Sequence, residues 1–290
     1  MRIEARAKIN WTLDIVGQRP DGYHLMDMLM QPVTLADEVC IAPAEELTLT
    51  TGGSPLLPAD ESHLALRAAK ALKQRTGYPG GAAIHVEKHI PVGAGMGGGS
   101  ADAAAVLAGL NRLWRTGLNQ DELEAIGLTL GADVPFCLRG GLTRTTGIGE
   151  CMEDLSCGQC WPLVVVQPCE GLSTKEIFNA YHESGSIRRP DNDRAAIALC
   201  TGDAAALNAA MGNVMQPVSE ARRSAIAEAI DALRACGAFA AQMTGSGSAV
   251  FGAFESMHAA QAAYEAISRR WERTFICETC MEGLVIRDED

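Results

Sequence analysis

A run of glycines between a strand-like segment and an apolar helical segment constrains this chain more than any other feature. Residues 90–107 read IPVGAGMGGGSADAAAVL, with five glycines from Gly93 to Gly99. Glycine permits positive φ angles and lets the backbone approach a ligand closely. A strand, a glycine loop and a helix in that order direct backbone N–H groups and the positive end of the helix dipole to one point. The segment therefore predicts a phosphate-binding loop, in which Ser100 either caps the helix or faces a phosphate-bound Mg²⁺; a capped helix without a ligand is the alternative.

Three common motifs do not fit this loop. The spacing G-x-G-x-x-G begins at Gly93, but a dinucleotide fold places an acidic residue at the end of a second strand ~20 residues later, where Asp121 and Glu122 instead open a predicted helix. A P-loop ends in Gly-Lys-Ser/Thr, whereas residues 99–101 are Gly-Ser-Ala. A serine hydrolase needs G-x-S-x-G, and Asp102 stands at its last glycine. The loop alone thus leaves the identity of the phosphate ligand open.

The composition sets limits on partners and location. The chain has 290 residues, of which 47% are hydrophobic and 21% charged, which is ordinary for a globular protein. A formal net charge of −12 argues against nucleic acid or an anionic membrane as a partner. The charged first ten residues do not fit a secretory signal, and no apolar run approaches the roughly 18 residues of a membrane span. We expect a cytoplasmic protein that is a monomer or a weak homodimer.

Ten cysteines raise the question of a metal or redox site. The spacing C-x-x-C occurs twice, at Cys157/Cys160 and at Cys277/Cys280, but more than a hundred residues separate the pairs, unlike a compact zinc ribbon. The second pair lies in a strand-like run, where positions i and i+3 face opposite sides. We expect reduced, unpaired thiols, with a structural zinc or a redox role as the alternative, and we assign no residue as a metal ligand.

The order of predicted elements indicates an α+β fold in two domains. Apolar and β-branched runs favour strands at 8–16, 25–34, 38–41, 82–89, 163–166, 239–243, 249–254 and 274–285, with a strand pair after Gly140. Helical spacing favours helices at 62–75, from the glycine loop to Trp114, and at 121–130, 174–182, 203–211, 219–236 and 257–271. Ser62 is the expected N-cap of the first helix, and Gly77 its stop. The pattern resets around 157–162, so we expect a nucleotide-binding domain over 1–155 and a second domain, completing the substrate site, over 156–290.

Three separated motifs resemble the superfamily of kinases for galactose, homoserine, mevalonate and phosphomevalonate. Residues 91–101 (PVGAGMGGGSA) are similar to its nucleotide loop, residues 7–10 (AKIN) to its first motif and residues 243–249 (MTGSGSA) to its third. The motifs occur in the family's order and span nearly the whole chain, which is far more specific than any single match. The resemblance implies a two-domain fold in which ATP and an alcohol substrate meet in the cleft between the domains.

Further segments resemble the branch of the superfamily whose alcohol substrate carries a cytidine diphosphate. They are residues 7–11 (AKINW), 17–24 (GQRPDGYH) and 130–135 (LGADVP). One position departs from the pattern, because Ala101 stands where many members carry a second serine. The resemblance implies phosphorylation of that alcohol by ATP with Mg²⁺. Another alcohol kinase of the superfamily is the second interpretation, and a nucleotide-binding protein without catalysis is the alternative from a different class.

Phosphoryl transfer to an alcohol needs a group that accepts the hydroxyl proton. Asp133 lies where a helix stops at Gly131 and Pro135 discourages its continuation, so we expect its carboxylate on a connection; an aspartate that only stabilises a turn is the alternative. Lys8, read alone, fits an exposed charge at a sheet edge. The resemblance instead pairs Lys8 with Asp133 as the two catalytic residues, the ammonium stabilising the charge that develops on the attacking oxygen.

The resemblance also implies which residues contact the two substrates. The nucleotide would contact Pro91, Val92, Gly93, Ala94, Gly95, Met96, Gly97, Gly98, Gly99, Ser100 and Ala101. The acceptor would contact Asn10, Tyr23, His24, Thr174, Phe178, Gly245, Ser246 and Gly247.

Each substrate contact has a structural alternative. Tyr23 and Phe178 can stack on the two faces of a cytosine while His24 bonds to its edge, or they can be packing residues. Residues 245–247 predict a second nest of backbone N–H groups for a diphosphate, or a tight hairpin without a ligand. Lys88, next to the glycine loop, either approaches the nucleotide or is solvated.

Overall fold

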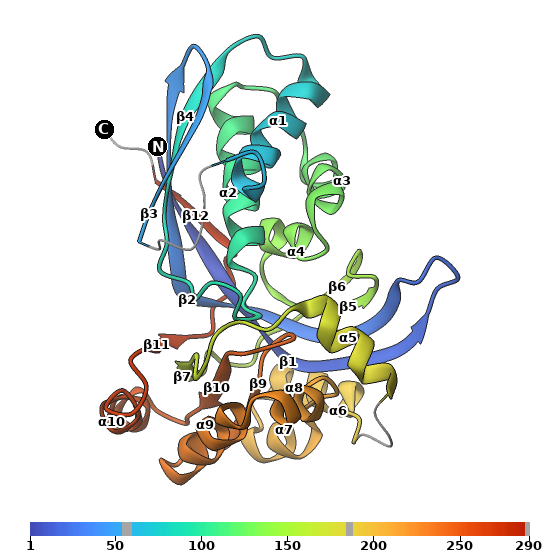
Figure 1. The fold of residues 1–290 in the computed structure, drawn as a ribbon, viewed down its shortest axis with the longest axis vertical. Helices are drawn as coiled ribbons and strands as arrows, with labels where there is room; N and C mark the ends of the chain where they lie inside the picture. The colour runs from blue at the N-terminus through green and yellow to red at the C-terminus, as the bar shows by residue number, and fades with distance from the viewer. Residues whose placement is uncertain (54–59, 184–187, 288–290) are drawn as a thin grey trace.

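The computed structural model describes residues 1–53, 60–183 and 188–287. In this part of the chain the helices pack on two β-sheets, one of eight strands and one of four (Figure 1). This arrangement confirms the predicted α+β class.

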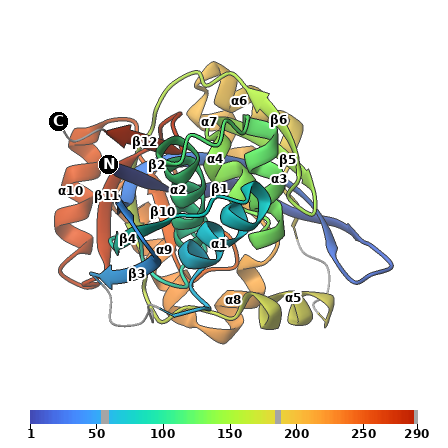
Figure 2. The ribbon, with the colours of Figure 1, turned by 90° about the horizontal axis from the view of Figure 1, so that it is seen from above.

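The larger sheet is built on one long antiparallel ribbon. Its strands β1 (Arg2–Gln18) and β2 (His24–Ala44) pair from Arg2 opposite Cys40 to Gln18 opposite His24. The predicted hairpin is therefore confirmed, and its strands are longer than expected. Bulges between Arg6/Lys8, Asn10/Thr12 and Ile15/Gly17 interrupt the register and bend the ribbon. The tip of the hairpin projects beyond the rest of the chain in both views (Figures 1 and 2).

Six short strands flank this ribbon, three on each half. Near the chain's N-terminus they are β12 (Leu284–Arg287) on β1, β4 (Gly81–Glu87) on β2 and β3 (Leu47–Gly52) outside β4. Towards the hairpin they are β8 (Gly212–Asn213) on β1, β5 (Leu142–Gly147) on β2 and β6 (Cys151–Leu155) outside β5.

Four helices of the first half pack together beside this sheet: α1 (Leu64–Thr76), α2 (Gly98–Leu113), α3 (Gln120–Leu130) and α4 (Val134–Arg139). Gly77 ends α1 in a left-handed conformation, as predicted, but the N-cap is His63 rather than Ser62, because Nδ1 of His63 accepts a hydrogen bond from Ala65 N (3.2 Å). We expected Pro135 to stop a helix from continuing. It instead lies in the first turn of α4, where a proline costs no hydrogen bond.

The second sheet has the strand order β11-β7-β10-β9. Its strands are β7 (Pro162–Val166), β9 (Ala240–Met243), β10 (Val250–Ala253) and β11 (Thr274–Glu278). The helices of this half are α5 (Thr174–Glu183), α6 (Asn192–Thr201), α7 (Ala204–Ala210), α8 (Gln216–Arg222), α9 (Ser224–Ala235) and α10 (Met257–Ile267).

Three features of this half differ from the sequence prediction. Helix α6 was not predicted. The helix expected over 219–236 is divided at Arg223, whose extended backbone separates α8 from α9. The strand expected over 274–285 is two strands in different sheets, because β12 leaves the second sheet and pairs with β1. We keep the two-domain division near residue 155 as a proposal, with β12 and β8 joining the larger sheet. None of the helices in the described ranges is long and apolar enough to cross a membrane.

Candidate active site

A cavity of about 520 Å³ lies where the three motifs meet. The predicted residues that line it come from both halves of the chain: Lys8, Asn10, residues 91–100, Asp133, Thr174, Phe178, Gly245 and Ser246. Four predicted residues are not part of its lining: Tyr23, His24, Ala101 and Gly247. The fold thus brings the motif residues to one place, although they are far apart in the sequence.

The backbone of the glycine loop is held between the first and third motifs. The N–H of Lys8 donates to Met96 O (3.0 Å), and the N–H of Ala249 donates to Ala94 O (3.1 Å). Gly95 has a φ of +78°, and a Cβ at this position would lie 2.4 Å from the backbone oxygen of Thr244. Glycine is therefore required here by a close approach of two backbones, and not only by a ligand.

Helix α2 directs its N-terminus at the cavity. Gly97, with a φ of +72°, is the N-cap, so Ser100 lies within the first turn. Of the two roles expected for Ser100, capping the helix is therefore wrong. Helix geometry leaves the N–H groups of Gly98, Gly99 and Ser100 without intrahelical partners, and all three residues line the cavity. Ala101 is fully buried and donates its N–H to Gly97 O (2.8 Å), which places it inside the helix and away from a ligand. The loop and helix together form a site for anionic oxygen atoms.

Lys8 and Asp133 form an ion pair at the cavity wall. Lys8 is buried, so it is not an exposed edge charge, and its Nζ lies 3.6 Å from Asp133 Oδ2. Asp133 is the N-cap residue of α4, yet its side chain makes no capping hydrogen bond, and about a third of it (34%) is exposed. The carboxylate is therefore available to a bound substrate while the ammonium is fixed beside it.

Asn10 joins the first motif to the third. Its Oδ1 accepts hydrogen bonds from Lys8 Nζ (2.8 Å) and from the N–H of Gly245 (3.1 Å), and its own N–H donates to Thr244 Oγ1 (3.0 Å). The N–H of Gly247 donates to Thr244 O (3.1 Å). The expectation of a nest of free N–H groups is therefore wrong for Gly245 and Gly247, because both groups are bonded within the protein.

The residues expected to contact the acceptor lie on β1, at the end of the hairpin, on α5 and in the third motif. Thr174 Oγ1 lies 2.9 Å from Ser246 Oγ, which joins the start of α5 to the third motif. The rings of His24 and Phe178 are stacked, with centroids 4.4 Å apart and an angle of 22° between the planes. Tyr23 is 60% exposed at the hairpin tip. One face of Phe178 is thus covered by His24, and the structure does not place Tyr23 opposite Phe178.

The apolar wall of the cavity was not predicted as part of the site. On the ribbon it is formed by Leu13, Met26 and Met28, and Met215, the N-cap residue of α8, also lines the cavity. In the sequence the three ribbon residues follow the alternation of ordinary buried strand positions, and nothing in that pattern separates a cavity wall from a core. Only the fold, which leaves the ribbon uncovered at this point, shows that they face a cavity.

Lys88 is buried rather than solvated. Its Nζ forms ion pairs with Asp37 and with Asp102, at 2.7 Å from Asp102 Oδ2, and all three side chains are almost completely buried. Asp37 Oδ1 also accepts from the N–H groups of His89 (2.6 Å) and Ile90 (2.8 Å). This cluster fixes the segment that leads into the glycine loop and ties it to α2.

The carboxyl group of Asp102 is in an unfavourable environment for a charge. Burial and the neighbouring Asp37 raise the pKa of Asp102 to about 7, although Lys88 acts in the opposite direction. Its Oδ1 has no hydrogen-bond partner in the structure. The folded chain therefore binds a proton at Asp102 more readily than the unfolded chain, whose aspartates titrate near ~3.9.

This difference predicts a pH-dependent loss of stability. Because the folded pKa is above the unfolded value, the contribution of Asp102 to stability is fully present below about pH 4 and is lost as the pH rises through about 7. An Asp102→Asn variant does not titrate there and should keep its hydrogen bond to Lys88. We expect the melting temperature of the variant, minus that of the wild type, to increase from pH 5 to pH 8. If the difference between the two melting temperatures stayed constant from pH 5 to pH 8, Asp102 would not titrate in this range.

Two family profiles match the chain. The profile of the GHMP kinases N terminal domain matches residues 63–141, and that of the GHMP kinases C terminal matches residues 195–273. The first covers the glycine loop and Asp133, and the second covers the third motif. The site described above therefore contains residues from both matched regions.

Individual proteins are similar over nearly the whole chain. A 4-diphosphocytidyl-2-C-methyl-D-erythritol kinase of Clostridium botulinum is 39% identical over 96% of this chain and 100% of its own length. The protein of the same name in Symbiobacterium thermophilum is 43% identical over 87% of this chain and 90% of its own.

Solved structures agree with these sequence relatives. A crystal structure of 4-(cytidine 5'-diphospho)-2C-methyl-D-erythritol kinase has a TM-score of 0.82 and 34% identity, covering 96% of this chain and 99% of that one. A homoserine kinase from Cytophaga hutchinsonii, at 19% identity and a TM-score of 0.73 over 98% of this chain and 96% of that one, shares the fold. The chain belongs to the 4-diphosphocytidyl-2-C-methyl-D-erythritol kinase family of the GHMP kinases.

Proposed function

We propose that this protein transfers the γ-phosphoryl group of ATP to the 2-hydroxyl of 4-diphosphocytidyl-2-C-methyl-D-erythritol, a step of the non-mevalonate route to isoprenoid precursors. The observation that carries the proposal is the Lys8–Asp133 pair, which lies on the same cavity as the glycine loop and the N-terminus of α2. The names of the relatives supply the substrate.

The geometry supports a simple division of roles in the transfer. The phosphates of ATP would bind the N–H groups of residues 98–100 and the glycine loop, where the helix dipole favours negative charge. Asp133 would accept the proton of the acceptor hydroxyl as the oxygen attacks the γ-phosphorus, and ADP would leave. Lys8, which Asn10 holds in place, would stabilise the negative charge on the reacting oxygens.

Mg²⁺ is part of this proposal as the ion that accompanies ATP. Within residues 1–53, 60–183 and 188–287, no group of three His, Cys, Asp or Glu side chains could hold a metal ion. Mg²⁺ in kinases is typically bound by one or two protein oxygen atoms together with the substrate phosphates and water. The hydroxyl of Ser100 is an oxygen donor on the cavity and fits this pattern, which leaves the carboxylate of Asp133 to accept the proton. Bound there, the ion would neutralise phosphate charge.

The remaining expectations enter the proposal in the same way. We assign recognition of the cytosine to Tyr23 and His24 of the hairpin and to Phe178 of α5. We assign recognition of the polar part of the acceptor to Asn10, Thr174, Gly245 and Ser246, which line the cavity. The net charge of −12 supports a small-molecule substrate rather than nucleic acid or a membrane surface. We also propose a cytoplasmic protein that acts as a monomer or a weak homodimer, since one chain supplies all the residues named here.

A coupled assay of ADP release tests the function directly. The purified protein, with ATP and Mg²⁺, is offered 4-diphosphocytidyl-2-C-methyl-D-erythritol, mevalonate, homoserine and galactose in parallel. We expect turnover with the cytidine substrate alone. Preferential turnover of one of the other three would contradict the proposed substrate while keeping the reaction type, and ATP binding without any turnover would favour a protein without catalysis.

Loss of the Phe178 ring should weaken binding of the acceptor but not of ATP. A stacked base contributes roughly 1 to 3 kcal/mol, so Phe178→Ala should raise the KM for the cytidine substrate about tenfold or more. Tyr78 is a matched control, because its ring stacks on Trp114 at 4.6 Å and 14°, and neither ring lines the cavity. Tyr78→Ala should lower the melting temperature without changing that KM. An unchanged KM in a stable Phe178→Ala protein would remove Phe178 from the acceptor site.

A further inference from the structure

The outer part of the β1–β2 hairpin receives little support from the rest of the sheet. On its outer edge, β1 pairs with β8 only at Thr12 and Leu13. On the other edge, β2 pairs with β5 from Met30 to Met26. Beyond these points, in the part of the chain that the structure describes, the two strands pair only with each other, and the tip of the hairpin projects past the body of the protein (Figures 1 and 2). A two-stranded ribbon is at best marginally stable by itself, so its direction depends on how its base is held.

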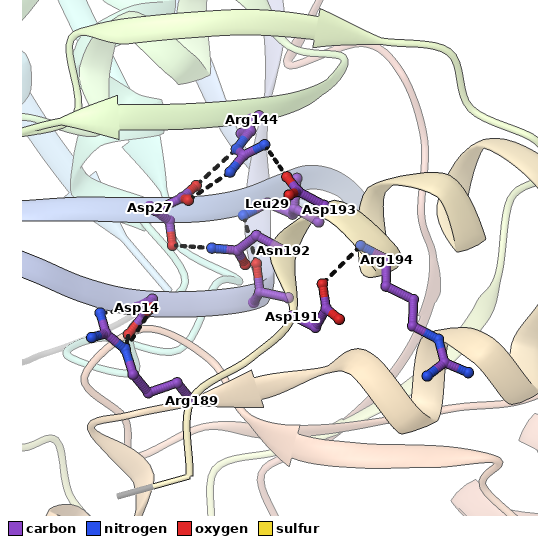
Figure 3. A network of polar contacts seen from close by, with 10 residues as sticks. Asp14, Asp27, Leu29, Arg144, Arg189, Asp191, Asn192, Asp193 and Arg194 are labelled. Carbon is purple, nitrogen blue, oxygen red and sulfur yellow. Dashed lines mark hydrogen bonds and ion pairs between the residues drawn. The ribbon is translucent and has the colours of Figure 1, made fainter.

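A polar network holds the hairpin at this base (Figure 3). We call it the hairpin clasp, and its members are Asp14, Asp27, Arg144, Arg189, Asn192 and Asp193. On the β1 side, Arg189 Nε lies 3.0 Å from both oxygens of Asp14, and Arg189 Nη2 donates to Ile15 O (2.9 Å). Arg189 thus occupies the edge of β1 directly after the last residue paired with β8.

On the β2 side, Arg144 forms a bidentate ion pair with Asp27. Its Nε donates to Asp27 Oδ1 (3.0 Å) and its Nη2 to Asp27 Oδ2 (2.8 Å), while Nη1 donates to Asp193 Oδ1 (2.6 Å) in the first turn of α6. Asn192 Nδ2 donates to the backbone oxygen of Asp27 (3.2 Å). One arginine therefore joins β5, β2 and α6, and bidentate pairs of this kind fix direction as well as distance.

One short segment of the second half contributes to both sides of the clasp. Residues 189–193 cross the base of the hairpin, bonding first to β1 and then to β2, and the N–H of Asp191 donates to Ala210 O (2.9 Å) at the end of α7. Asp14 and Asp27 are themselves direct neighbours across the ribbon. The segment thus holds both strands of the hairpin at the same level and attaches them to the second half.

The position of His24 depends on the direction of the hairpin. A strand rises roughly 3.3 Å per residue, so His24 lies about 10 Å beyond Asp27, and a tilt of roughly 10° at the clasp would move its ring by about 2 Å. That displacement would remove the stack on Phe178, whose ring is on α5 and not on the hairpin.

We propose that the hairpin clasp is a positioning device for the acceptor substrate. The clasp holds His24 against Phe178, and it holds Met26 and Met28 in place at the cavity wall. Arg144, Arg189 and Asp27 act through the hairpin and do not touch the reacting atoms. The proposal rests on the proposed function in that the affected substrate is the cytidine compound. The nucleotide loop lies on other elements, so the clasp should not affect ATP.

The test compares Arg144→Met with Arg139→Met. Arg139 is a matched control, because its Nε and Nη2 bind Glu124 at 3.0 and 2.8 Å, its exposure equals that of Arg144, and its Nη1 lies 3.9 Å from Asp154. The control pair joins α3 to the end of α4 remote from Asp133 and does not contact the hairpin. Both variants should therefore lose similar stability, and only Arg144→Met should change acceptor binding.

We expect Arg144→Met to raise the KM for the cytidine substrate about tenfold, with the KM for ATP nearly unchanged, since a misplacement of about 1 Å is enough for effects of this size. Arg189→Met, which removes a half-exposed guanidinium and is less disruptive, should act in the same direction. Equal KM changes in Arg144→Met and Arg139→Met, or equal changes for both substrates, would overturn the proposal.

Hydrogen exchange separates this proposal from the proposed function. In Arg144→Met, but not in Arg139→Met, backbone amides of residues 16–26 should exchange faster than in the wild type, whatever the substrate is. Faster exchange without turnover of the cytidine substrate by the wild type would mean that the clasp holds the hairpin and that the substrate is a different one. Unchanged exchange in a folded Arg144→Met protein would show that the clasp does not position the hairpin.

Discussion

Replacing Asp133 with asparagine is expected to lower kcat by about 10² to 10⁴-fold, the usual size of the effect when a general base is lost. The amide keeps the shape of the side chain but cannot accept the hydroxyl proton. The Asp133 side chain makes no capping hydrogen bond that the variant could lose, so we expect any fall in the melting temperature to come from the lost ion pair with the buried Lys8. ATP affinity, measured by calorimetry, should also stay close to that of the wild type.

Asp203→Asn is a suitable control for this variant. Asp203 is also a helix N-cap, and its side chain does accept a hydrogen bond, from the N–H of Ala206 (2.9 Å). Asparagine caps helices as well as aspartate does, so turnover and stability should both be retained. If Asp133→Asn turned over like the wild type, Asp133 would be a turn residue and another group would have to accept the proton.

Gly97→Ala should reduce turnover about 100-fold through a displacement of Lys8. A Cβ at this position would lie 3.2 Å from Cγ and 3.3 Å from Cε of Lys8, and 3.8 Å from Asp133 Oδ2. The flexible lysine can move by a fraction of an ångström, but its ammonium then leaves the position beside Asp133. We expect the shift of Cγ and Cε to displace the ammonium further, by about 1 Å, and a misplacement of that size at a reacting centre can cost about 10² in rate. Steady-state kinetics with both substrates measures the effect.

Gly77→Ala separates this contact from backbone strain. Gly77 has a φ of +70°, close to the +72° of Gly97, and a Cβ there would meet nothing within 4 Å. Both variants place an alanine in the left-handed region and should lose similar stability, about 1 kcal/mol. Only Gly97→Ala should lose activity. Equal activities would mean that the space above Gly97 is not part of the site.

The residues of the site could be predicted because each motif has its own local signature. The glycine loop predicted a strand, a loop and a helix, and the structure has β4, the loop and α2 in that order. The pairing of Lys8 with Asp133 came from the family resemblance, and the structure places the two side chains together. Local patterns could not show this contact, since a buried lysine and an edge lysine occur in the same strand pattern.

The errors come from positions where a local signal has two structural outcomes. Pro135 discourages a preceding helix and equally suits the first turn of a new one, and the structure has the second outcome. The glycines at 245 and 247 suit a nest of N–H groups that are free to bind a ligand. In the structure these N–H groups instead donate hydrogen bonds to Asn10 and Thr244. The hairpin clasp could not be predicted, because its charges lie in three separate regions that look like ordinary exposed positions in the sequence.

The pairing of β12 with β1 has a consequence for how the protein is made. These strands come from opposite ends of the chain, with Arg2 opposite Arg287. During synthesis the larger sheet therefore stays incomplete until β12 has left the ribosome, and this edge of β1 is open to other chains until then. Closing the sheet joins two strands that are far apart in the sequence, which is a slow kind of step. A chain cut before Leu284 would fold with an unprotected edge on its larger sheet.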